Sequence, residues 1–111
     1  MTRVFEDESS LMERAKEIAR RALSGERDSL LACRDLADLR GRLPGVSDQT
    51  MNIFVGVASE VDDLPIGAER EHWADEVLRS KDIAAADYRE RVRATVEEAL
   101  QELLMALGGR H

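Results

Sequence analysis

The stretch that decides the fold is residues 82–107, DIAAADYRERVRATVEEALQELLMAL. Its apolar residues recur every three or four positions, which is the spacing of one face of an α-helix. That stripe consists of Tyr88, Val92, Val96, Ala99, Leu100, Leu103, Leu104 and Leu107. We therefore expect a long final helix that starts at Asp75 or Asp82 and is ended by Gly108-Gly109.

The length of this helix is itself informative. Counted from Asp82 it has about 26 residues and measures roughly 39 Å, whereas a compact domain of this size has a radius of gyration of about 13 Å. The helix must therefore bend, project beyond the rest of the domain or pack on a second copy. Its leucine-rich end fits two arrangements equally well: a homodimer through this helix, or a monomer that covers the leucines itself.

Two shorter helices are expected upstream. The first begins near Ser10, because Ser10 and Glu13 have the spacing of a capping box, and it ends at Gly25. The second spans about Asp28 to Arg40. Since the connection between them is so short, the two helices should be antiparallel neighbours.

A third helix starts at Ser47 or Asp48, which are both good N-caps. Its apolar face consists of Met51, Phe54, Val55, Ala58 and Val61. Gly56 within this helix costs up to about 1 kcal/mol relative to alanine, which indicates a close helix crossing at that position. A short fifth helix is possible near residues 68–73. The sequence thus predicts one all-α domain over residues 1–111, a bundle of four main helices with a frayed start (1–9) and a tail (108–111).

Composition narrows the classes of function. Acidic residues outnumber basic ones by 23 to 16, which gives a net charge of −7 and opposes nucleic-acid binding. The single cysteine, Cys33, cannot form an internal disulfide bond. Neither a signal peptide nor a membrane span is apparent, so we expect a soluble, cytoplasmic protein without membrane or cofactor partners.

One segment interrupts the helical pattern: Ser59 to Trp73, SEVDDLPIGAEREHW. Irregular segments on a rigid scaffold are where functional side chains are usually displayed. The segment combines three closely spaced acids with the only tryptophan, and acids of this kind would steer a basic partner. We therefore expect a non-enzymatic protein-binding module of the inhibitor, immunity or adaptor kind. The expected contact residues are Glu60, Asp62, Asp63, Leu64, Ile66, Arg70, Glu71, His72 and Trp73.

Trp73 has two interpretations at this point. It can fill a gap in the core beneath the segment, or it can serve as an anchor in a pocket of a partner, sharing a helical face with Arg70. Exposure of Trp73 beside Arg70 would favour the anchor, and full burial would exclude it.

Two further alternatives stay open. Glu60, Asp62 and His72 could belong to a small metal-assisted enzyme, although their spacing matches no calcium loop or zinc motif. The segment could also be purely structural, with Glu60 paired to Arg70. No catalytic residue and no metal ligand are assigned.

The same segment carries a resemblance. Ser59-Glu60-x-Asp62-x-Leu64-Pro65-x-Gly67-x-x-Arg70-x-x-Trp73, with an upstream Gly25…Cys33-Arg34-x-Leu36-x-x-Leu39-Arg40, resembles small uncharacterised bacterial proteins. Val61 and Asp63 depart from that family, in which threonine and histidine usually stand there. The resemblance implies a mostly helical fold and no established activity. In size, acidity and its acid-aromatic segment, the chain is also similar to bacteriocin immunity proteins as a class.

Overall fold

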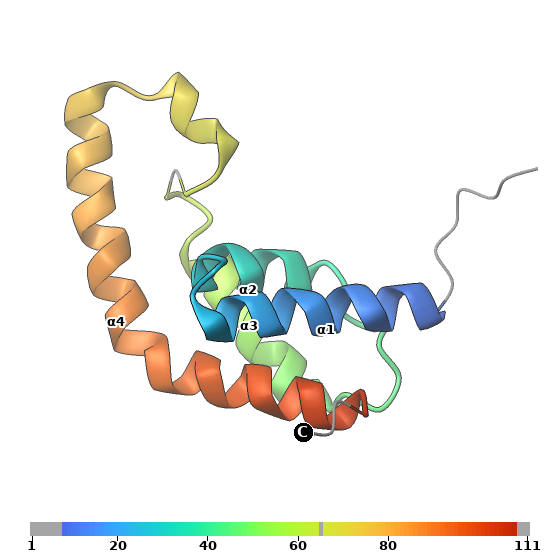
Figure 1. Ribbon diagram of the computed structural model, residues 1–111. Coiled ribbons are helices and arrows are strands. Elements are labelled where there is room, and N and C mark those ends of the chain that lie inside the picture. The colour runs from blue at the N-terminus through green and yellow to red at the C-terminus, as the bar shows by residue number, and fades with distance from the viewer. Residues whose placement is uncertain (1–7, 65, 109–111) are drawn as a thin grey trace, which may run out of the picture.

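A computed structural model describes residues 8–64 and 66–108 of the chain, except for the side chains of Glu8, Ala68 and His72. The elements follow in the order α1 (Glu8–Ser24), α2 (Ser29–Ala37), α3 (Asp48–Glu60), a 3₁₀ helix η1 (Ala68–His72) and α4 (Asp75–Ala106). Figure 1 shows α1, α2, α3 and the second half of α4 packed together as the body of the molecule. The predicted all-α bundle of four main helices is confirmed, and so is the short extra helix.

The start of α1 differs from the prediction. The helix already includes Glu8 and Ser9, so Ser10 lies inside it and does not serve as its N-cap. A capping box requires a non-helical first residue, which is why the Ser10–Glu13 spacing was misleading. The frayed start predicted for residues 1–9 lies mainly outside the described residues, as does most of the tail at 108–111.

The ends of α2 and α3 follow local chemistry. The Asp28 carboxylate accepts a hydrogen bond from the Leu31 amide at 3.1 Å and caps α2, while Ser47 Oγ accepts from the Thr50 amide at 3.1 Å and caps α3. α2 ends at Ala37 rather than Arg40, because residues 38–41 form turns that close at Gly41 with φ +80°. A positive φ of this kind favours glycine.

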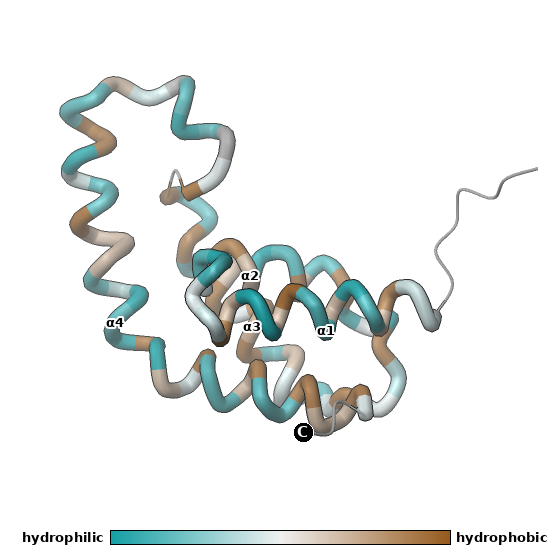
Figure 2. Tube along the Cα trace, viewed as in Figure 1, coloured by the Kyte–Doolittle hydropathy of each residue, from teal (hydrophilic) through white to brown (hydrophobic). Residues whose placement is uncertain are grey.

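The core lies between the four helices and is built almost entirely from aliphatic side chains. Its largest fully buried members are Leu30, Leu36, Leu39, Phe54, Val61, Val96, Leu100 and Leu103. Figure 2 shows hydrophobic positions on the sides of the helices where they pack against each other. These leucines are covered by the helices of the same chain. A homodimer through the final helix stays a prediction.

The prediction for Gly56 was wrong. No atom lies within 4 Å of the position that a Cβ would occupy there, and the residue is exposed. α3 instead buries the side that carries Met51, Phe54 and Val57. Gly56 therefore does not lie at a close helix crossing.

α4 bends between two halves of different character. Its second half packs on α1 and α3, whereas its first half runs away from the body, as Figure 1 shows. The helix contains neither proline nor glycine; Ala85 belongs to the core cluster, and Tyr88 and Val92 pack against it. We attribute the bend to this packing. The radius of gyration of 15.0 Å exceeds the roughly 13 Å of a compact domain, because the first half of α4 projects.

Candidate functional site

Residues 62–87, which we call the limb, comprise the turn after α3, η1 and the first half of α4. Figure 1 shows the limb standing away from the body, and Figure 2 shows hydrophilic residues along much of it. The segment that the sequence singled out thus forms the part of the molecule that protrudes most clearly. The limb is the candidate site.

Three apolar residues, Val61 just before the limb and Leu64 and Ile66 within it, attach its base to the core. Val61 is 1% exposed and Leu64 is 9% exposed, and both belong to the core cluster, while Ile66 packs against it. Leu64 was expected to contact a partner, but its burial makes it an anchor of the limb. We therefore leave Leu64 out of the candidate surface.

An ion pair joins η1 to α2. Arg34 Nη1 donates to Glu69 Oε2 at 3.1 Å, across 35 positions of sequence. The same carboxylate oxygen accepts from the Gly67 amide at 3.3 Å. Hydrogen bonds from the backbone amide of Glu69 itself and from Arg34 lower the pKa of the Glu69 carboxyl. The carboxylate of Glu69 therefore holds the limb in place and is occupied within the chain.

A second ion pair joins η1 to α4. Arg70 Nη1 donates to Asp82 Oδ1 at 2.6 Å and Arg70 Nη2 donates to Asp82 Oδ2 at 3.1 Å. This two-pronged contact fixes the plane of the guanidinium and lowers the pKa of the Asp82 carboxyl. The pairing of Arg70 with Glu60 considered from the sequence is wrong, because the guanidinium lies on Asp82. Arg70 is thus a positioning residue of the limb.

The remaining acids of the segment are exposed. Glu60, Asp62, Asp63 and Glu71 all present their side chains to solvent. Glu60 lies at the foot of the limb near Tyr88, whose pKa is raised by burial and by this neighbouring carboxylate. The acids expected to meet a partner are therefore accessible.

The negative charge of the whole protein is concentrated here. Residues 59–77 contain seven acids and one base, Arg70, which leaves −6 of the total net charge of −7. The rest of the chain is almost balanced. Such an uneven distribution creates a local negative potential that attracts basic surfaces.

Trp73 ends η1, and its amide donates to the Arg70 carbonyl at 3.1 Å. Its side chain is half-buried. It is therefore neither fully buried, which would exclude the role of an anchor in a partner, nor fully exposed. Val77, on the next turn of the chain, is 40% exposed. The two side chains offer apolar surface next to the acids, while the side chain of His72 lies outside the described residues.

Sequence reasoning missed three residues that build the limb: Arg34, Glu69 and Asp82. Their partners lie 35 and 12 positions away, so no local spacing rule reveals them. Arg34 belongs to the upstream block of the resemblance, and that was the available signal. What the block could not indicate was that Arg34 contacts the limb.

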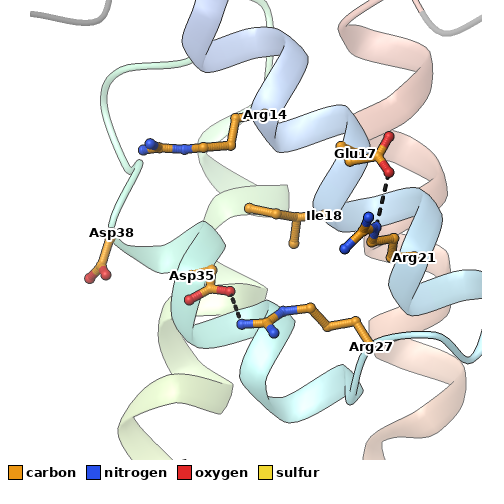
Figure 3. A pocket seen from close by; sticks show the side chains of 7 residues that line it. All are labelled: Arg14, Glu17, Ile18, Arg21, Arg27, Asp35 and Asp38. Carbon is orange, nitrogen blue, oxygen red and sulfur yellow. Dashed lines mark hydrogen bonds and ion pairs between the residues drawn. The ribbon is translucent and has the colours of Figure 1, made fainter.

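A metal centre finds no support in the described part of the chain. Within it, no three side chains of histidine, cysteine, aspartate or glutamate lie close enough together to hold an ion. A cleft of about 410 Å³ lies between α1 and α2. Figure 3 shows two ion pairs around the apolar side chain of Ile18: Glu17 with Arg21 along α1, and Arg27 before α2 with Asp35 on α2. We assign no chemistry to this cleft.

Comparison with protein-family models, with curated proteins and with solved structures finds no match. The resemblance drawn from the Ser59–Trp73 segment therefore stays a prediction. As for membranes, none of the helices within residues 8–64 and 66–108 combines the length and the hydropathy that a crossing requires.

Proposed function

We propose that this protein is a non-enzymatic binding module of the inhibitor, immunity or adaptor kind, and that it binds a basic protein through the limb. The single observation that carries the proposal is the concentration of −6 charge in residues 59–77, which run from the end of α3 at the foot of the limb into the limb itself. The contact residues are Glu60, Asp62, Asp63, Ile66, Glu71, His72, Trp73 and Val77.

The internal ion pairs support this proposal. Because Glu69 and Asp82 are engaged by Arg34 and Arg70, the limb is held in one arrangement before a partner arrives. A preorganised surface loses less conformational entropy on binding than a flexible one. The exposed acids then steer the encounter, and Trp73 supplies apolar contact at its centre.

We further propose that the protein acts in the cytoplasm of a bacterium. Cys33 is a free and fully buried thiol, which suits a reducing compartment. The bacterial origin rests on the resemblance of the segment alone.

The test is capture of a partner from the native host on immobilised protein, with the wild type compared with an Asp62→Ala/Trp73→Ala variant. We expect a basic protein that the wild type retains and the variant does not, with retention decreasing as salt is raised. Glu97→Ala is the control, because Glu97 is an exposed acid on the second half of α4. Equal retention by all three proteins would refute the proposal.

The same variants distinguish the proposed binding role of the limb from a purely structural one. If the limb only closes the bundle, Asp62→Ala would lower the free energy of unfolding and leave every interaction unchanged. We expect the opposite, because Asp62 is exposed and substitutions at such positions usually change stability by less than about 0.5 kcal/mol. Thermal unfolding monitored by circular dichroism measures this difference.

A further inference from the structure

A second surface feature lies between α1 and the second half of α4 and shares no residue with the limb. It is a groove of about 590 Å³, within the roughly 300–1,000 Å³ typical of small-molecule sites. Leu23 of α1 and Leu104 and Met105 of α4 give it apolar walls. Met105 is 71% exposed, which is unusual for a large apolar side chain in this protein.

The polar rim of this groove has one sign of charge. Among its described lining residues, Arg20 is charged, Ser24 and Gln101 are neutral, and none is acidic. The whole protein has a net charge of −7, whereas the described lining of this groove carries one positive and no negative charge. The cleft between α1 and α2 offers a contrast, since arginines and carboxylates there face each other.

Arg20 forms an ion pair with Glu17 along α1, but this pair includes no hydrogen bond from the guanidinium. Arg20 Nη1 lies 3.6 Å from Glu17 Oε1, which is beyond hydrogen-bond distance. Glu17 instead accepts a hydrogen bond from Arg21 Nε at 3.0 Å. The Arg20 side chain is 51% exposed and can therefore turn its guanidinium toward a carboxylate placed at the rim.

We propose that this groove binds a small amphiphile that has an anionic head and a single apolar chain. Arg20 holds the head, and Leu23, Leu104 and Met105 enclose the chain. Most small-molecule sites share this composition, a mainly apolar wall with a few polar groups that fix orientation. The positive sign of the rim selects a carboxylate over a cationic or uncharged head.

The test uses octanoate, octan-1-ol and octyltrimethylammonium, each below its micelle concentration, titrated into the protein and followed by methyl NMR. We expect saturable shifts at Leu23, Leu104 and Met105 that are strongest for octanoate and weakest for the cation. Arg20→Gln should weaken octanoate binding about fivefold and change octan-1-ol binding less than about twofold. Arg20 is half exposed, so this variant should fold.

Two variants complete the design. Arg21→Gln is the matched control, because the neighbouring arginine lines the other cleft, and it should leave octanoate binding unchanged. Met105→Asp introduces a carboxylate on an exposed wall and should abolish octanoate binding without unfolding the protein. The proposal is overturned by absence of saturable shifts, or by equal effects of Arg20→Gln and Arg21→Gln. Self-association that Met105→Asp removes would also overturn it, because the groove would then accept a second copy.

Discussion

Thr50 shows how a single residue acquires its role from its surroundings. It is the one buried polar residue in the described core, at 5% exposure. Its hydroxyl donates to Glu102 Oε1 at 3.0 Å and accepts from Ser47 Oγ at 3.0 Å. The hydroxyl thus joins the start of α3 to α4, and a buried polar group of this kind is stable only while it keeps its partners.

We predict that Thr50→Val lowers the free energy of unfolding by about 1–2 kcal/mol, although the side chain keeps its size and branching. Chemical denaturation of the wild type and the variant measures the difference. Thr95→Val on α4 is the control, because Thr95 is exposed, and its effect should stay below about 0.5 kcal/mol. An equal effect of the two substitutions would mean that the buried hydrogen bonds contribute nothing.

Gly56 gives the opposite kind of prediction. Because a Cβ there meets no atom within 4 Å, Gly56→Ala should raise the free energy of unfolding by up to about 1 kcal/mol through helix propensity. Gly45→Ala is the contrast, since Gly45 has φ +89° and its Cβ would lie 3.4 Å from the Ala106 carbonyl. It should destabilise the protein. Thermal unfolding measures whether each substitution raises or lowers the stability. Destabilisation by Gly56→Ala would support the close helix crossing that the sequence predicted at this position.

At the scale of elements, the position of η1 depends on ion pairs and not on its own helical bonds. η1 has only five residues, and no side chain caps its start. Arg34 reaches it from α2 and Asp82 reaches it from α4. The sequence indicated that a short helix exists here, but its placement required two contacts that are distant along the chain.

These contacts predict a response to acid. The pKa of Asp82 is lowered by Arg70 and that of Glu69 by its own amide and by Arg34, so both carboxylates are stabilised in the charged form. A lowered pKa contributes stability above the unfolded value, about 4, and that contribution is lost as the pH falls through the folded value. We therefore expect the limb to loosen below about pH 4 and to stay in place at neutral pH.

The fluorescence of Trp73 measures this response, because Trp73 is the only tryptophan and directly follows η1. Its emission should shift to longer wavelength on acidification. Asp82→Asn should show part of that shift already at pH 7, whereas Asp87→Asn, which removes an exposed pair with Arg91, should not. Constant emission of the wild type down to pH 3 would show that the ion pairs do not position the limb.

At the scale of the whole molecule, Cys33 reports on global unfolding. Its side chain is fully buried in the core cluster, to which all four helices contribute, and burial raises the pKa of its thiol to about 12. Since the thiolate is the reactive form, both access and ionisation protect this residue in the folded state.

We predict that iodoacetamide at pH 8 leaves Cys33 unmodified in native conditions and alkylates it rapidly in denaturant. The slow native rate should track the equilibrium population of the unfolded state. Thr50→Val should therefore raise that rate and Gly56→Ala should lower it. Mass spectrometry of the alkylated protein gives the rates, and rapid native modification would indicate a local opening of the core.

The sequence by itself determined that the chain forms four main helices and which leucines of α4 are buried, because helical periodicity is read within a few neighbouring residues. It also determined the charge of the Ser59–Trp73 segment. It did not determine the buried face of α3, where Val57 takes the place expected for Val55 and Ala58. Only the tertiary structure decided that α4 bends, that Leu64 is an anchor, and that Arg70 lies on Asp82. Those outcomes depend on side chains that are distant along the chain and meet only when the helices pack, so no local pattern encodes them.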